Sequence, residues 1–273
     1  MWYLERMKLG PSFSVATWNV NSLRARKERL ISFLDRERPD VVCLQELKMQ
    51  TDQFPQMDFL QMGYQAAWVG QKAYNGVAIL SKKEHGPLTD IRENLGDEDL
   101  DPAARVIGAT IESLGVRVMS VYVPNGQEVG SDKFDYKKKW LARLLSFLNK
   151  HHRKEEDLII AGDFNVAPED RDVYDPIGLK ESVICRRDAR EAFSQVLKFG
   201  LCDALRLHTQ EDNMYTYWDY QQLAFPKNNG LRIDHVLVTE TLSGACRKVW
   251  IDRNERKGTK PSDHVPLVAY FER

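Results

Sequence analysis

The sequence predicts an α/β sandwich, in which two β-sheets pack face to face and helices cover their outer faces. Segments typical of strands outnumber segments typical of helices, several strands follow one another in meander-like pairs, and each half of the chain supplies a long amphipathic helix. With 273 residues, 42% of them hydrophobic, the chain can bury a large core. We expect a single domain over residues 1–273, in which residues 1–12 are an N-terminal extension.

In the first half, alternating residues 13–18 predict a strand, and residues 24–38 predict a helix with Leu30, Phe33 and Leu34 on one face. Further strands are expected at residues 41–44, 64–69, 76–80, 105–111 and 116–123. The polar, acidic stretch 84–102 predicts a loop. Ser131 is a suitable N-cap for a helix that continues to about Asn149.

In the second half, the apolar residues 158–161 lead into Gly162 and predict a buried strand that delivers Asp163 and Asn165 to a loop. Two residues apart on an extended backbone, these side chains point to the same side. The remaining segments are expected to be a loop at 168–187, a helix at 189–199, an aromatic strand at 215–220, a loop at 221–229, a strand at 231–238 that contains Asp234, and strands at 246–251 and 265–271.

The charge balance excludes a basic field over the whole protein, because the formal net charge is −1. A nucleic-acid partner would need the local basic clusters at residues 24–29, 137–139 and 253–260, although a solvated face explains each cluster alone better. The four cysteines form no C-x-x-C pair, which disfavours zinc and fits a reduced, cytoplasmic protein. No signal peptide or membrane-length apolar run is present.

Polar side chains gather where the predicted apolar strands end. They are Asn19, Asn21, Glu46, Tyr122, Asn125, Asp163, Asn165, Asp234, Asp263 and His264. Any one of them is ordinary turn chemistry, but binding and catalytic groups concentrate on loops held by a rigid scaffold. Recurrence at so many strand ends therefore favours a functional site.

Carboxylates and amides without thiolates indicate a hard cation, Mg²⁺ or Mn²⁺. Glu46 follows the apolar run VVCLQ at the edge of the core, where a charge is usually paired or metal-bound. A salt bridge to Lys48 or to an arginine is the alternative, and metal binding is favoured. A buried Asp234 needs a donor, which His264 or Arg232 could supply.

These groups suit phosphodiester hydrolysis, which needs an activated water, a cation on the phosphate oxygens, and donors for the charge of the transition state. The sequence contains neither a G-x-S-x-G elbow nor a P-loop.

Six motifs in order resemble the exonuclease III family of apurinic/apyrimidinic endonucleases, which belong with deoxyribonuclease I to the endonuclease/exonuclease/phosphatase superfamily. They are WNVNSLR (18–24), LQELK (44–48), YVPNG (122–126), GDFNVAP (162–168), GLRIDHVL (230–237) and PSDHVP (261–266). The resemblance extends from about Phe13 to the end of the sequence. It implies a four-layered α/β sandwich of two mixed sheets flanked by helices.

The resemblance also implies roles for the site residues. Glu46 would be the principal Mg²⁺ ligand, with Asn19, Asn21 and Asp263 near the metal, although other members carry Asp at the position of Asn21. Asp163 would handle the proton of the attacking water. Asn165 and Asn19 would position the Asp163 carboxylate and stabilise the transition state. Tyr122 and Asn125 would contact the phosphate, and His264, held by Asp234, would bind a phosphate oxygen.

The implied activity is cleavage of the DNA backbone 5′ to abasic sites, with removal of nucleotides or blocking groups from 3′ ends. The partner would be double-stranded DNA, bound by a monomer. Independently of the resemblance, Arg24, Lys133, Lys137 and Lys260 are candidate phosphate contacts because they flank the site motifs. Tyr217, Trp218, Phe225 and Leu231 would form an abasic pocket. The alternative is that these aromatic side chains belong to the core. For Tyr217 the pocket and the core are almost equally supported, and for Trp218 the pocket is favoured.

Two other functions stay open. A relative on the same fold could act on RNA, a phosphoinositide or sphingomyelin, although the stretch YTYWDY before GLRID favours DNA repair by resemblance. A non-catalytic RNA-binding regulator would lack the acidic motifs. Because Glu46, Asp163, Asp263 and His264 are all present, this last alternative is the weakest.

Overall fold

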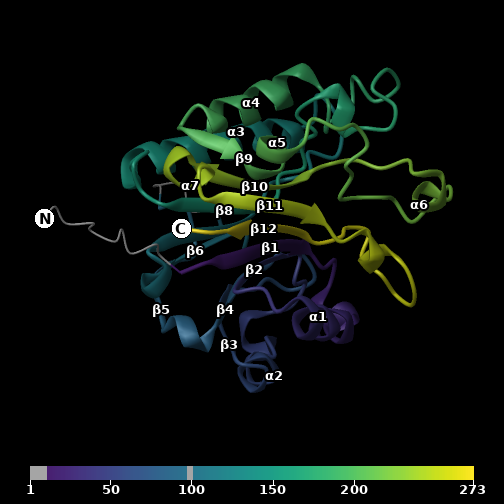
Figure 1. Cartoon of the computed structure of the whole chain (residues 1–273). Coiled ribbons are helices and arrows are strands. Elements are labelled where there is room, and N and C mark those ends of the chain that lie inside the picture. Colours follow the sequence, from purple (N-terminus) through teal and green to yellow (C-terminus); the bar gives the residue numbers. More distant parts are fainter. Residues whose placement is uncertain (1–10, 97–100) are drawn as a thin grey trace, which may run out of the picture.

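The computed structural model describes residues 11–96 and 101–273 and confirms the predicted sandwich. Two six-stranded sheets pack face to face, with helices on both outer faces, so that four layers result (Figure 1). The strand orders are β11-β12-β1-β2-β4-β3 and β5-β6-β7-β8-β10-β9. The core between the sheets includes Val15, Cys43 and Ile79 from the first sheet and Val118 and Ile159 from the second.

The first sheet joins both ends of the described chain. Its strands are β1 (Phe13–Asn19), β2 (Val41–Gln45), β3 (Tyr64–Val69), β4 (Val77–Lys82), β11 (Cys246–Ile251) and β12 (Leu267–Phe271). Strand β1 lies parallel to β2 and antiparallel to β12. Helices α1 (Leu23–Glu37) and α2 (Gln56–Gln61) cover its outer face, where Leu30 and Phe33 pack against Trp18.

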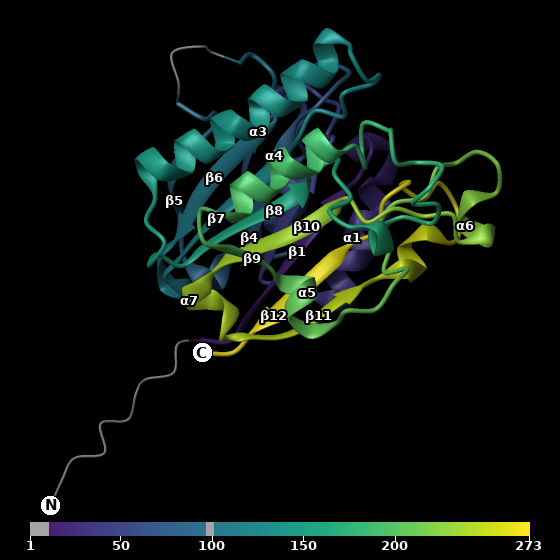
Figure 2. The same cartoon turned by 90° about the horizontal axis from the view of Figure 1, so that it is seen from above.

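The second sheet comes from the middle of the chain. Its strands are β5 (Leu88–Arg92), β6 (Val106–Ile111), β7 (Val116–Tyr122), β8 (Leu158–Asp163), β9 (Leu201–Asp203) and β10 (Asp234–Thr239). Helices α3 (Asp132–His151) and α4 (Arg187–Leu197) lie side by side over it, as the view from above shows (Figure 2). The short helices are α5 (Ala204–His208), α6 (Ala224–Lys227) and α7 (Glu240–Ser243).

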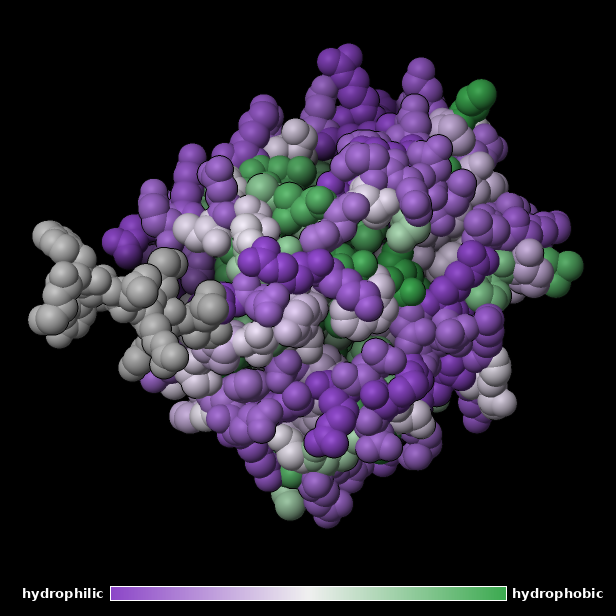
Figure 3. Space-filling model, in the orientation of Figure 1, coloured by the Kyte–Doolittle hydropathy of each residue, from purple (hydrophilic) through white to green (hydrophobic). Residues whose placement is uncertain are grey.

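Helix α3 shows why the sequence folds in this way. Ser131 caps it as predicted, since its hydroxyl accepts a hydrogen bond from the backbone N–H of Phe134 at 3.3 Å. Leu141, Leu144 and Leu148 are buried against the second sheet. On the face drawn in Figure 3 hydrophilic side chains dominate, and the hydrophobic ones form small patches. No helix in residues 11–96 or 101–273 is long and apolar enough to cross a membrane.

Three predicted elements are wrong. The stretch 84–102, expected to be a loop, contains strand β5, a partly exposed edge strand; residues 97–100 of it lie outside the described residues. Residues 215–220 form no strand, and Tyr217 makes only isolated bridges to Leu231 and His264. The strand expected at 231–238 begins at Asp234, so this carboxylate stands at a strand end. Residues 1–10 of the proposed N-terminal extension also lie outside the described residues.

Candidate active site

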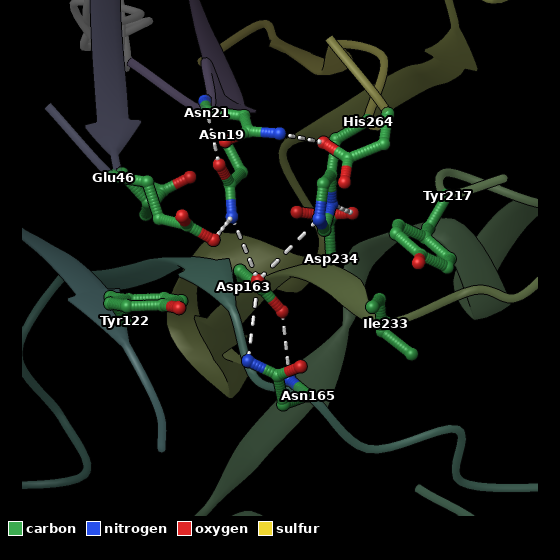
Figure 4. Close-up of polar contacts among 12 residues, drawn as sticks. Asn19, Asn21, Glu46, Tyr122, Asp163, Asn165, Tyr217, Ile233, Asp234 and His264 are labelled. Atoms are coloured by element: carbon green, nitrogen blue, oxygen red, sulfur yellow. Dashed lines mark hydrogen bonds and ion pairs between the residues drawn. The ribbon is translucent and has the colours of Figure 1, made fainter. Parts of the chain in front are cut away.

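The predicted polar residues converge at one end of the two packed sheets (Figure 4). Strands β1, β7 and β8 finish there with Asn19, Tyr122 and Asp163. Strand β10 runs antiparallel to β8 and therefore begins at the same end, with Asp234 directly opposite Asp163. The site thus draws side chains from both sheets.

Asn19 connects the two sheets at this end. Its side chain is fully buried, and its Nδ2 donates to Oε1 of Glu46 at 2.8 Å and to Oδ2 of Asp163 at 3.0 Å. Its Oδ1 accepts from the backbone N–H of Asn21 at 3.0 Å. One amide therefore fixes the separation of two carboxylates that belong to different sheets.

Three site residues adopt the left-handed backbone region that non-glycine residues avoid. They are Asn21 (φ 43°), Glu46 (φ 54°) and Asn165 (φ 50°). Asparagine tolerates this region, whereas glutamate does so at a cost of roughly 1–3 kcal/mol. Strain of this kind persists where surrounding contacts dictate the conformation, which supports a functional role for the turn after β2.

Glu46 is ionised in this setting. Burial alone would raise its pKa, but the Lys48 ammonium, 2.7 Å from Oε2, and the amide of Asn19 outweigh burial and leave the pKa below its usual value. The alternative salt bridge with Lys48 is therefore present. Lys48 also donates to Oδ1 of Asn21 at 2.5 Å. Metal binding by Glu46 remains a proposal.

His264 supplies the donor that buried Asp234 needs. Its Nδ1–H donates to Oδ2 of Asp234 at 2.8 Å, and its Nε2 lies 3.7 Å from Oδ2 of Asp163. Burial lowers the pKa of His264, but the carboxylates of Asp234 and Asp163 outweigh burial and raise it to about 10. The imidazole is therefore an imidazolium at neutral pH.

Arg232, the other candidate donor, points elsewhere. Its guanidinium binds Asp172 through Nε (2.6 Å) and Nη2 (3.1 Å) and Asp203 through Nη1 (2.5 Å). His235 donates from Nε2 to the carbonyl of Val166 at 2.9 Å and accepts from Arg232 at Nδ1. This buried network lies behind the loop that follows β8.

Asp163 and Tyr122 both have raised pKa values. Burial raises the pKa of Asp163, helped by the nearby Asp234 and Glu46, while the imidazolium of His264 counteracts the shift. Burial and the carboxylates of Glu46 and Asp163 hold the pKa of Tyr122 well above its usual value. Tyr122 is therefore a phenol that can donate a hydrogen bond.

The donor set fits a hard cation. Oδ1 of Asp234 is buried with no hydrogen-bond partner, and the ligand atoms of Asp163, Asp234 and His264 lie within 4.8 Å of one another. Because His264 is an imidazolium with no free lone pair, the two carboxylates are the members of this group that can bind a cation. Glu46 adds a carboxylate that shares the amide of Asn19 with Asp163. Asp263 accepts from Nδ2 of Asn21 at 2.9 Å. Oxygen-rich sets of this kind suit Mg²⁺ or Mn²⁺ better than softer metals.

Two cavities flank the cluster. One, of about 610 Å³, is lined by Tyr122, Asn125 and the exposed Lys133, together with Arg105, whose guanidinium lies 4.8 Å from the centre of the Tyr122 ring. The other, of about 290 Å³, is lined by apolar and polar side chains that include Tyr217 and Leu231.

Trp218 and Phe225 do not line the second cavity, which corrects their predicted place in a pocket. Trp218 is 1% exposed and packs edge to face against Phe225, with ring centres 5.2 Å apart. Its neighbour Tyr217 faces the opposite way and packs against the His264 ring at 4.9 Å. Tyr217 thus lines the cavity, whereas Trp218 belongs to the core.

The basic candidates also divide. Arg24, Lys133 and Lys260 are exposed, but Lys137 is completely buried and makes no surface contact, so its expected role as a DNA phosphate contact is wrong. Sequence reasoning missed its true position, although a signal existed. Lys137 lies three residues after Phe134 and four before Leu141, on the apolar stripe of α3.

Together the fold and the site define a phosphoester hydrolase of the α/β-sandwich type. Residues 16–264 match the Endonuclease/Exonuclease/phosphatase family, so the chain belongs to this family and is a nuclease. Exodeoxyribonuclease III of Haemophilus influenzae is 34% identical over 267 residues, which cover 93% of this chain and 98% of that protein.

Solved structures agree with this assignment. An AP endonuclease from Archaeoglobus fulgidus superposes with a TM-score of 0.90 at 38% identity, covering 95% of this chain and 99% of that one. A 3′ phosphatase from Neisseria, bound to a product DNA hairpin, gives a TM-score of 0.89 at 40% identity, covering 95% and 99%.

Proposed function

We propose that this protein is a DNA-repair phosphodiesterase that cleaves the DNA backbone 5′ to abasic sites by metal-assisted hydrolysis. We further assign it 3′–5′ exonuclease and 3′-end-cleaning activity, supported by the 3′ phosphatase among its relatives. The observation that carries the proposal is the buried contact of Asn19 with both Glu46 and Asp163, which holds a metal-ligand candidate beside a proton acceptor.

A cation held by Glu46, with Asn19, Asn21 and Asp263 nearby, would supply Lewis-acid stabilisation of the phosphate oxygens. This chain's own groups do the rest. Asp163 faces the site with a raised pKa and takes the proton of the attacking water. The imidazolium of His264 lies 3.7 Å from Asp163 and binds a phosphate oxygen.

The remaining donors surround the phosphate. The Tyr122 phenol and the amide of Asn125 can donate to oxygens that gain charge in the transition state. The Nδ2 of Asn165 already donates to the carbonyl of Val123 at 2.9 Å and to Oδ2 of Asp163 at 3.3 Å. Asn165 also orients Asp163, since its backbone N–H donates to Oδ1 at 2.9 Å.

Selection of abasic sites rests on the cavity beside Tyr217 and Leu231. An extruded sugar without a base costs less unstacking energy than an intact nucleotide, and a cavity of about 290 Å³ suits so small a group. Exposed basic side chains such as Arg24, Lys133 and Lys260 would bind the phosphate backbone of double-stranded DNA and hold the duplex beside this cavity. We assign the protein to the cytoplasm, because its four cysteines form no disulfide, and we propose that it acts as a monomer.

The test is a duplex oligonucleotide with one abasic analogue, incubated with and without a chelator. Cleavage 5′ to the analogue that needs Mg²⁺ or Mn²⁺ is expected. Glu46→Gln should abolish most activity at low Mg²⁺ and keep the fold, whereas the control Glu84→Gln, on an exposed side chain, should cleave normally. Unchanged turnover in Glu46→Gln would remove Glu46 from the site.

A further inference from the structure

A lysine ammonium is buried in the second sheet's helical layer, directly behind the site. Lys137 in α3 is 0% exposed, whereas Lys139 two residues on is exposed. Removing an ammonium from water is costly unless it is paired or fully hydrogen-bonded. A lysine in such a place therefore needs an explanation.

The explanation is a set of three backbone carbonyls. The Nζ of Lys137 donates to the carbonyl of Asn165 at 2.6 Å, of Val183 at 2.6 Å and of Asn125 at 3.2 Å. An ammonium has three donors and no acceptor, so these bonds use its whole capacity. Methionine, of similar length, would leave all three carbonyls without this partner.

Two of the three carbonyls belong to residues of the candidate site. Asn165 reaches Asp163 through its backbone N–H (2.9 Å) and its Nδ2 (3.3 Å). Its Oδ1 accepts from Nδ2 of Asn125 at 3.0 Å. Lys137 therefore holds the carbonyl of the same residue whose N–H and side chain orient Asp163.

The neighbouring turn is built around the same side chain. Gly126 has a φ of 96°, and a Cβ added there would lie 3.2 Å from Cδ of Lys137. Burial lowers the pKa of Lys137 to about 7, although Asp163, Cys185 and Asp188 offset part of this shift. The ammonium and the Asp163 carboxylate thus favour each other's charged form.

We infer that Lys137 is a positioning residue for the phosphodiester hydrolysis, and that its three-point contact with Asn125, Asn165 and Val183 fixes the orientation of Asn165 and Asp163. The inference rests on the proposed function. Lys137 touches no substrate itself, so its removal should slow the chemical step and leave DNA binding largely intact.

The test compares Lys137→Met with the unsubstituted protein and with Lys150→Met, a control at an exposed position near the end of the same helix. Single-turnover cleavage of the abasic duplex at saturating enzyme reports the chemical step. The Kd for the duplex in the presence of a chelator reports binding. We expect Lys137→Met to lose ~10- to 100-fold in rate with Kd within about threefold, because small misplacements of catalytic groups have effects of this size.

The outcomes separate the two proposals. No cleavage by the unsubstituted protein would refute the proposed function and this inference with it. Normal cleavage by folded Lys137→Met would overturn the inference alone and make Lys137 structural, and an equal loss of rate and affinity would overturn it in favour of DNA binding. If Lys137→Met does not fold, Lys137→Gln, which keeps two donors, is judged by the same criteria.

Discussion

Replacing Trp218 by alanine should destabilise the protein without changing its substrate preference. The Trp218 side chain is 1% exposed and makes edge-to-face contacts with Phe225 at 5.2 Å and Tyr215 at 6.3 Å. Truncating a buried aromatic residue costs roughly 3–5 kcal/mol. At about 2–4 °C per kcal/mol for a domain near this size, Tm should fall by about 6–20 °C.

The matched variant is Tyr217→Ala, on the next residue. Tyr217 lines the small cavity and packs against His264, so its loss should lower cleavage of abasic DNA more than removal of 3′ nucleotides. Thermal melting and both activities are measured on both variants. Trp218→Ala with a nearly unchanged Tm and an altered activity ratio would refute this division between core and cavity.

Three further predictions follow from charge. The pKa of His264 is raised to about 10, so its phosphate binding, measured with chelator present, should stay full through neutral pH and weaken only as pH rises through about 10; a loss of binding near the ordinary histidine pKa of about 6.5 would count against the Asp234 pairing. Burial would raise the pKa of Asp172, but Arg232 and Arg206 hold this pKa below its usual value. The ionised carboxylate therefore stabilises the folded protein above about pH 4, and this stabilisation is lost as the pH falls through the lowered pKa. Arg232→Met should therefore unfold at a higher pH than the unsubstituted protein in an acid titration, and its free energy of unfolding at neutral pH should be lower by roughly 3–5 kcal/mol. An unchanged midpoint of acid unfolding would refute the role of this ion-pair network. Lys133→Gln should reduce the salt slope of DNA binding by about one unit, and an identical slope would exclude Lys133 as a phosphate contact.

The sequence alone predicts strands β2 and β8, which lead to two of the site carboxylates. Glu46 and Asp163 each follow a run of buried apolar residues, and a charge at such a place marks a strand end that faces something other than solvent. The same reasoning placed Asn19 and His264 near them. Strand β5 was not predicted, because an edge strand with mostly exposed residues lacks the alternating apolar pattern that indicates a strand.

The environment of irregular segments could not be derived in this way. Tyr217 and Trp218 lie in a stretch with no regular period, so only the tertiary structure decides which ring faces the cavity. Lys137 is predicted to be a phosphate contact because it flanks the site motifs, and lysine in general prefers water. Lys137 is buried instead, because carbonyls from three separate loops come together around its ammonium. A local sequence pattern does not encode such a meeting of distant segments.

The pairing of β1 with β12 has a consequence for how the protein comes into being. Phe13 pairs with Phe271, so β1 can pair with β12 only after the long stretch of chain between them has been synthesised, and contacts so far apart in sequence form slowly. A nascent chain that has reached Val238 already carries Glu46, Asp163 and Asp234, yet it lacks His264 and the strand that completes the first sheet. We therefore expect the nuclease site to be complete only after β12 has been synthesised and has paired with β1.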